Sequence, residues 1–294
     1  MRTAFLIAAC LIGLPAVAAA QPSNLWYFCD QPDPGALSEK APRQSGDPVP
    51  TAADKAAAAG AVAKADALRV GLSRGDPLGE PYDGAARWAA LGQKATDPEL
   101  AELFRRVAMD QFSRLHKEAA IQHTSWAEGL SPAATSYAYA IISTRDFCGT
   151  DEENTAWLEK ELAAKNLFKR STFGDGAANA AFLLVQHADR NRPFQRKALA
   201  MMEPLMATGD VRPQNYALLF DRVAVGEGRP QRYGSQGGCT GPGVWTEKPV
   251  EDAATLDQTR AKVGLEPMAA YRARFVAGCG GAAPTAAASA SPRR

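Results

Sequence analysis

Apolar residues recur every three to four positions along most of the chain, which is the spacing of one buried face of an α-helix. No stretch alternates apolar and polar residues with the period of two that a half-buried strand shows. We therefore predict an all-α, bundle-like fold. Three of the predicted helices begin at 98, 132 and 150. The others span 53–73, 83–95, 175–187, 193–208, 213–226, 256–263 and 267–277.

Start signals support several of these helices. Asp97 precedes Pro98, so an N-cap acceptor is followed by a proline at the first helical position. Ser131 precedes Pro132 in the same arrangement. Thr150, which is followed by an acidic run, predicts that a separate helix begins there.

The first 20 residues have the pattern of a secretory signal peptide. Arg2 supplies a positive charge, a run of roughly a dozen mainly apolar residues follows, and three alanines end the segment before Gln21. The alternative is a lipid anchor on Cys10, which is disfavoured because so few residues precede it and the apolar run continues past it. We therefore predict a periplasmic or secreted protein.

The rest of the chain divides by composition. A proline-rich stretch predicts an extended arm, and an Ala-, Ser- and Pro-rich end predicts a disordered tail. Two helical regions lie between them. The predicted segments are a signal peptide at 1–20, an arm at 21–50, an N-terminal helical region at 51–147, a second helical domain at 151–277 and a tail at 280–294.

Four cysteines follow the leader, and an even number in an exported protein predicts two disulfides. Three connectivities are possible, of which we favour Cys29–Cys148 and Cys239–Cys279. The second pair joins a glycine-rich loop to the last helix. No two of these cysteines form a C-x-x-C pair, so we predict no metal site from them.

Composition and charge narrow the function classes. Of the 294 residues, 46% are hydrophobic and 22% are charged, which are ordinary globular values. Lys and Arg number 33 and Asp and Glu 32, so loss of Arg2 leaves 32 of each and no net charge. This balance disfavours nucleic acid as a partner. No stretch after the leader reaches the roughly 18 apolar residues of a transmembrane helix.

Polar residues stand inside strongly apolar helices at three places. Each must be paired or hydrogen-bonded, because an isolated buried charge is very unfavourable. We predict that they partly converge. They are Asp110, Gln111 and Arg114, then Gln186, His187 and Asp189, and finally Asp221 and Arg222. A polar core network, a ligand or catalytic site, and separate surface pairs all remain open as interpretations.

The glycine-rich loop 226–243 lacks the Gly-Lys-Ser/Thr end of a phosphate-binding loop. It also lacks a G-x-S-x-G motif, since Tyr233 stands where that motif has glycine. We expect a structured crossover loop held by Cys239. Alternatively, Gln231, Tyr233 and Gln236 cover the polar network from one side.

The order of motifs over 151–275 resembles a bacterial family known as a domain of unknown function and numbered 6624. The motifs are Gln186-His187-Ala188-Asp189, Asp221-Arg222, Gln231-x-Tyr233-Gly234-Ser235-Gln236 and Arg260-x-x-x-Gly264-Leu265-x-Pro267. The resemblance implies a shared helical domain and carries no activity with it. Relatives commonly have threonine at the position of Ser235, which weakens Ser235 as a nucleophile.

Two function classes follow from these residues. The first is an envelope module that binds a small molecule or a protein, or has a structural role, through a buried polar network. The alternative is a hydrolase-like enzyme in which Asp189 or Asp221 orients His187 as a general base. No paired-ligand motif predicts a metal or another cofactor. We expect His116 and His123 to be solvated on their helix.

Overall fold

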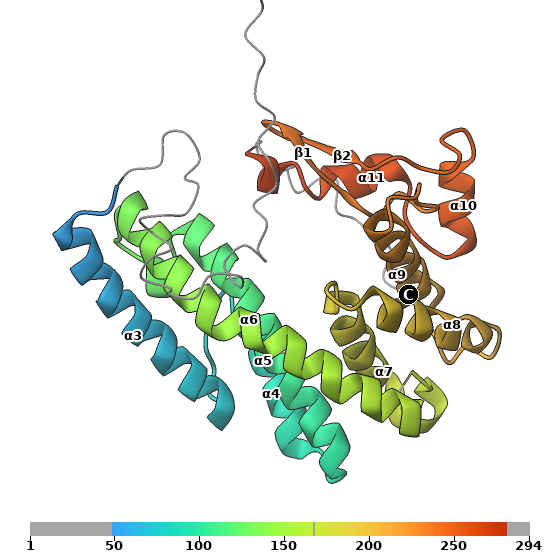
Figure 1. Ribbon diagram of the computed structural model, residues 1–294, viewed down its shortest axis with the longest axis horizontal. Coiled ribbons are helices and arrows are strands. Elements are labelled where there is room, and N and C mark those ends of the chain that lie inside the picture. Colours follow the sequence, from blue (N-terminus) through green and yellow to red (C-terminus); the bar gives the residue numbers. More distant parts are fainter. Residues whose placement is uncertain (1–48, 167, 281–294) are drawn as a thin grey trace, which may run out of the picture.

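A computed structural model describes residues 49–166 and 168–280 (Figure 1). The helices are α3 (Ala52–Arg74), α4 (Asp83–Lys94), α5 (Pro98–Gln122), α6 (Pro132–Ala164), α7 (Arg170–His187), α8 (Arg192–Ala207), α9 (Pro213–Gly226), α10 (Leu256–Lys262) and α11 (Met268–Ala273). Two short 3₁₀ turns are η1 (Ser125–Ala127) and η2 (Ala277–Cys279), and two strands are β1 (Gly237–Gly241) and β2 (Val244–Glu247).

This architecture confirms the predicted all-α class. Within the described residues, no helix has the length and apolar character needed to cross a membrane. The predicted signal peptide, arm and tail lie outside the described residues, apart from the ends of the arm and tail at 49–50 and 280.

The helix ends follow the capping signals. The Asp97 carboxylate accepts hydrogen bonds from the backbone N–H groups of Glu99 and Leu100 at 2.8 and 3.2 Å. The Ser131 hydroxyl accepts one from Ala134 N at 3.1 Å. Gly174 has φ 81° inside α7, so the regular helix starts after it, as the sequence predicts.

The prediction of a separate helix at Thr150 is wrong, because α6 runs unbroken for 33 residues. The Thr150 hydroxyl donates to the carbonyl of Asp146, four residues earlier, at 2.7 Å. This back-bond satisfies the hydroxyl inside a continuous helix, so Thr150 does not cap a new one. The predicted boundary between residues 147 and 151 therefore falls within α6.

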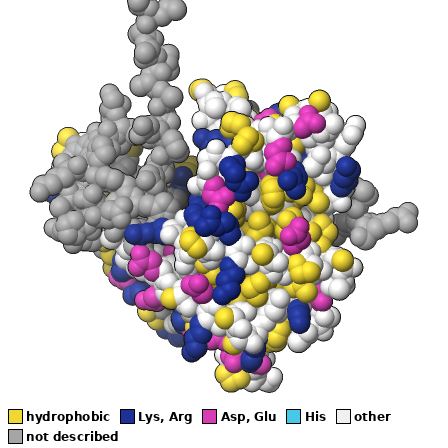
Figure 2. Space-filling model, turned by 45° about the vertical axis from the view of Figure 1, so that its right-hand side comes forward, with side chains coloured by type: hydrophobic (Ala, Val, Ile, Leu, Met, Phe, Trp, Pro, Cys, Tyr) yellow, Lys and Arg dark blue, Asp and Glu magenta, His cyan; other side chains and the backbone are white. Residues whose placement is uncertain are grey.

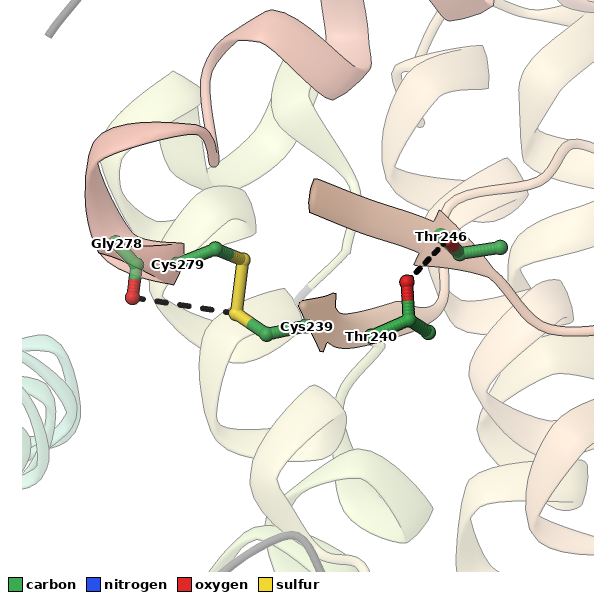
Figure 3. The surroundings of a disulfide bond; sticks show 5 residues. All are labelled: Cys239, Thr240, Thr246, Gly278 and Cys279. Atoms are coloured by element: carbon green, nitrogen blue, oxygen red, sulfur yellow. Dashed lines mark hydrogen bonds between the residues drawn. A yellow bond between two sulfur atoms is a disulfide. The ribbon is translucent and has the colours of Figure 1, made fainter. Parts of the chain in front are cut away.

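The glycine-rich loop contains an antiparallel hairpin that periodicity did not predict. Cys239 pairs with Trp245, and the Thr240 and Thr246 hydroxyls are 2.8 Å apart across the strands (Figure 3). Strand β1 is mostly glycine, so it has no apolar alternation to detect. A side chain at Gly237 would collide with the Trp245 ring, which explains the glycine there.

Two large apolar cores share α5 and α6. One core joins the first half of α5 and the second half of α6 to α7, α8 and α9, and it includes Leu103, Leu158, Phe182 and Leu219. The other joins α3, α4 and η1 to the remaining halves of α5 and α6. Because each long helix contributes to both cores, polar groups on α5 and α6 lie between them.

A third, smaller cluster packs Trp245 of β2 against Leu256 of α10 and Met268 of α11. The predicted disulfide Cys239–Cys279 is present and fastens the hairpin beside this cluster (Figure 3). The Gly243 N–H also donates to the Cys279 carbonyl at 2.7 Å. The pairing Cys29–Cys148 involves Cys29, which lies outside the described residues.

Replacing both Cys239 and Cys279 with serine is expected to destabilise the protein by about 3–4 kcal/mol, because the bond closes a loop of 40 residues in the unfolded chain. Urea unfolding followed by circular dichroism measures this difference. Thr240→Ala in the same hairpin is the control and is expected to change little. Equal stability of the double serine variant and the parent would contradict this role.

Candidate functional site

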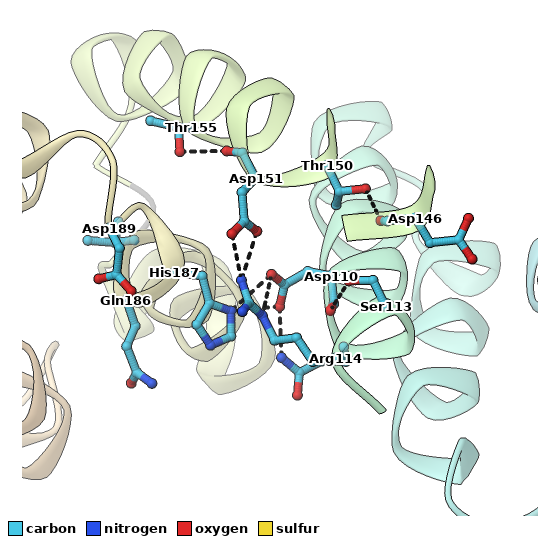
Figure 4. Close-up of polar contacts among 12 residues, drawn as sticks. Asp110, Ser113, Arg114, Asp146, Thr150, Asp151, Thr155, Gln186, His187 and Asp189 are labelled. Carbon is cyan, nitrogen blue, oxygen red and sulfur yellow. Dashed lines mark hydrogen bonds and ion pairs between the residues drawn. The ribbon is translucent and has the colours of Figure 1, made fainter. Parts of the chain in front are cut away.

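The carboxylate of Asp110 is the centre of a buried polar cluster. Asp110 lies on α5 and is 0% exposed. Its oxygens accept hydrogen bonds from His187 Nδ1 at 2.8 and 2.9 Å, Arg114 Nε at 3.1 Å and Gln111 Nε2 at 2.8 Å (Figure 4). Burial raises the pKa of this carboxyl, but its interactions with His187 and Arg114 outweigh that effect and hold the pKa at about 2.

Arg114 extends this cluster from α5 to α6. Its Nη2 donates to both oxygens of Asp151 at 2.7 and 2.9 Å, and its guanidinium lies 4.7 Å from the centre of the Phe147 ring. Burial raises the pKa of Asp151 to about 7, although the charge of Arg114 opposes this shift. Sequence reasoning missed Asp151, because its place in an acidic run after Thr150 looked like the first turn of a helix.

His187 ends α7 and presents one ring nitrogen to Asp110. Because a carboxylate accepts, Nδ1 carries the proton and Nε2 keeps its lone pair. No other described residue hydrogen-bonds Nε2, and the side chain is 11% exposed. Burial lowers the pKa of His187, and the charges of Arg114 and Arg222 lower it further against the opposing effect of Asp110. Burial therefore favours the neutral form of the ring.

Asp189 belongs to a separate pair rather than to His187. Arg222 Nε and Nη2 donate to the two oxygens of Asp189 at 2.8 and 2.6 Å. Arg192 lies 3.2 Å away, and Gln195 Nε2 donates at 3.3 Å. The residue that orients His187 is thus Asp110. Figure 4 draws no contact between Asp189 and His187.

Asp221 anchors the loop after α9 and is 0% exposed. One oxygen accepts from the backbone N–H groups of Arg232 and Tyr233 at 2.8 and 2.9 Å, and the other accepts from Ser235 N at 2.8 Å. Both carboxylate oxygens are therefore occupied by the loop. The Asp221 side chain holds the loop in place, and no interaction links it to His187.

Gln231 and its neighbours complete this loop. The Gln231 amide is 0% exposed and donates to the carbonyls of Gln236 and Lys248 at 2.7 and 2.9 Å. Tyr233 meets the Phe220 ring edge to face, and Gln236 Nε2 donates to the Ser235 hydroxyl at 3.2 Å. These residues bind their own loop, and no described contact places them over Asp110 or His187. Apart from Gln186, the helix and loop residues singled out above therefore fall into three clusters. The Gln186 carbonyl accepts from Gln195 Nε2 at 3.2 Å, and Figure 4 draws no contact of the Gln186 side chain with His187.

These clusters can be compared with known proteins. Residues 129–281 match DUF6624, which is described as a family of unknown function. The chain belongs to the DUF6624 family. The search of curated proteins and the search of solved structures gave no match.

The DUF6624 match includes Asp151, His187, Asp189 and Asp221. It begins within the segment before α6, earlier than the resemblance at 151 suggested. Asp110, which orients His187, precedes the matched residues. The cluster therefore joins the DUF6624 segment to a helix outside it.

Arg260 of the last DUF6624 motif is also fully buried. Its guanidinium donates to the carbonyls of Tyr233 and Glu266, and it lies 4.7 Å from the centre of the Tyr271 ring. It fixes the opposite side of the loop that Asp221 holds. Among the described residues, no group of three or more His, Cys, Asp and Glu side chains is arranged to hold a metal ion.

The expectation that His116 is solvated is wrong, whereas His123 is exposed. His116 is 0% exposed, with Nδ1 2.8 Å from the Tyr82 hydroxyl and Nε2 3.0 Å from Asp146. The sequence around His116 did not indicate burial, because the residues that bury it, Tyr82 and Asp146, lie on other elements of the fold. His116 and Tyr82 precede the DUF6624 match, whereas Asp146 lies within it.

Asp221→Ala is expected to lower the free energy of unfolding by on the order of 3 kcal/mol or more, because three backbone N–H groups lose their acceptor in a buried site. Urea unfolding measures this loss. Asp252→Ala, which removes an exposed carboxylate that also accepts a backbone N–H, is the control and is expected to cause a much smaller loss. Similar losses in both variants would show that Asp221 does not organise the loop.

The pKa of His187 is expected to respond in opposite directions to its two charged neighbours. Asp110→Asn lowers it further, because the negative charge that favours the imidazolium is gone. Arg222→Gln raises it, because a repelling positive charge is gone. Nitrogen-15 NMR of the three histidine side chains follows these titrations. Arg196→Gln is the control, and a shift as large as that of Arg222→Gln would contradict the assignment.

Proposed function

We propose that this DUF6624 domain is a binding module for a small polar molecule that donates a hydrogen bond to Nε2 of His187. The observation that carries the proposal is the contact of His187 Nδ1 with the buried carboxylate of Asp110 at 2.8 Å. This contact fixes the tautomer and leaves Nε2 as an acceptor. A hydroxyl, amine or amide N–H of a ligand satisfies it.

The rigidity of the surroundings supports binding. Asp110 is held by Gln111 and Arg114, and Arg114 is held in turn by Asp151. A ring fixed in this way loses little freedom when a ligand arrives, which favours affinity.

The charges around His187 favour a ligand without a large net charge. Asp110, Asp151 and Asp189 face the three cations Arg114, Arg192 and Arg222, and the pairs between them are close. Acidic and basic side chains are also intermixed over the face seen in Figure 2. This distribution gives little long-range attraction for a highly charged polymer.

We place the binding module outside the cytoplasm, in the periplasm or as a secreted protein. The leader pattern over the first 20 residues supports this location. The Cys239–Cys279 disulfide supports it independently, since such bonds persist in oxidising compartments. A small molecule or a protein of the cell envelope is then the partner.

A hydrolase-like enzyme is the second candidate, and the lowered pKa of His187 favours it. A neutral imidazole with a free Nε2 takes a proton from water as a general base, while Asp110 stabilises the resulting imidazolium. Water is the nucleophile in this scheme, because Ser235 is buried in the loop that Asp221 holds. Loss of ester hydrolysis in His187→Gln, but not in the titration control Arg196→Gln, tests this candidate.

A screen of small polar molecules by nitrogen-15 NMR tests the binding proposal. A ligand is expected to shift Nε2 of His187 and to raise the melting temperature of the parent protein. The sealed His116 and the exposed His123 are internal controls in the same spectrum and are expected to stay unchanged.

His187→Gln separates binding from a structural role. Glutamine keeps an N–H for Asp110, so we expect a melting temperature close to that of the parent and loss of the ligand-induced rise. A variant that melts many degrees lower, together with no compound that shifts Nε2, would show that the network only holds the helices together.

A further inference from the structure

A hollow of about 380 Å³ lies on the N-terminal half of the molecule, away from His187. It is bounded by the second half of α3, by the turn that follows α3 and by the start of η1. This volume is within the range of sites that hold small molecules. Its lining consists of Lys64, Ala67, Leu68, Gly71, Arg74, Asp76, Pro77, Leu78, Ser125 and Trp126.

The walls of the hollow are mainly apolar. Leu68, Pro77 and Leu78 contribute apolar surface, and the fully buried Trp126 lies at the base of the hollow. Behind the indole, the His116 ring lies edge-on with its centre 6.4 Å away. Since Tyr82 and Asp146 hold both nitrogens of His116, this wall is fixed by a buried polar chain.

The backbone at the hollow is also held in an unfavourable conformation. Ser125 has φ 56°, a left-handed value that residues with a side chain seldom adopt. Such a conformation persists only where the surrounding contacts enforce it, and it is concentrated at ligand sites. It places the serine beside Trp126 in the lining of the hollow.

The rim carries a positive charge without a counterion. Arg74 donates to Asp76 through Nε and Nη2 at 2.9 and 2.6 Å, so these two charges offset each other. Lys64 is exposed, and no carboxylate lies within 4.0 Å of its ammonium among residues 49–166 and 168–280. An anion at the rim therefore meets an unpaired lysine.

We propose that this hollow binds a small amphipathic anion. Its apolar body lies against Leu68, Pro77 and Leu78, and its carboxylate or sulfonate faces Lys64. The site lies wholly before residue 129, so it is separate from the segment that matches DUF6624. It is also independent of the ligand proposed for His187.

Naphthalene-2-sulfonate is the probe for the test, with the neutral naphthalene-2-methanol for comparison. Calorimetric titration of the full chain is expected to show saturable binding of the sulfonate. Lys64→Gln is expected to weaken it about two- to fivefold, as for an exposed charge pair, and to leave the neutral probe unchanged. Lys117→Gln, on an exposed lysine of α5, is the matched control and is expected to change neither.

A second pair of variants tests the location. Ala67→Trp fills the hollow from an exposed position of α3 and is expected to abolish binding of both probes. Ala63→Trp adds the same side chain one turn earlier, outside the lining, and is expected to bind like the parent. Unchanged binding in Ala67→Trp, equal weakening by the two lysine variants, or no binding at the solubility limit would each overturn the proposal. His187→Gln leaves this binding intact, so the two proposed sites fail separately.

Discussion

A buried carboxylate on a helix needs neighbouring side chains that donate hydrogen bonds or carry positive charge, and this requirement organises the centre of the molecule. Asp110 of α5 meets it with Arg114 on its own helix and with His187 at the end of α7. Arg114 then brings Asp151 of α6 into the cluster. Three helices are thereby fixed relative to one another at the place where the two large cores meet.

Two buried aspartates, Asp110 and Asp221, and the partly buried Asp189 are satisfied in different ways. Asp189 is satisfied by the planar guanidinium of Arg222, and Asp221 is satisfied by backbone N–H groups of a loop. The Asp221 arrangement uses both carboxylate oxygens, and the Asp189 arrangement pairs its carboxylate with a cation. Asp110 differs, because one of its partners is a ring with a second nitrogen. His187 therefore offers a ring nitrogen, Nε2, as a hydrogen-bond acceptor or base, and the other two clusters have no such group.

Sequence patterns predicted the helices well because their ends are local. Caps such as Asp97 and Ser131 act within one turn, so the chain itself records where the helix begins. The polar residues inside apolar runs were also identifiable, since burial of a charge requires a partner. The partners were not identifiable, because Asp110 and His187 are 77 residues apart.

The errors have different origins. Thr150 looked like a cap, but its hydroxyl bonds back along α6, and His116 looked solvated until Tyr82 and Asp146 closed over it. The hairpin was missed because glycine supplies backbone freedom without a hydrophobic signal. Only for His116 did contacts with distant segments override the local pattern; the Thr150 back-bond and the hairpin are local features that the residue types did not reveal.

The unbroken course of α6 has a consequence for how the protein can be divided. At about 1.5 Å per residue, its 33 residues form a rod of roughly 50 Å that both large cores use as a wall. A fragment that begins at residue 151 would retain Leu158 and Leu162 while losing the helical turns that precede them. Ile142 would remain with the other piece, no longer on a helix that continues into the first core. Any shortened form meant to fold by itself therefore has to keep this rod whole, together with the part of α5 that packs along it.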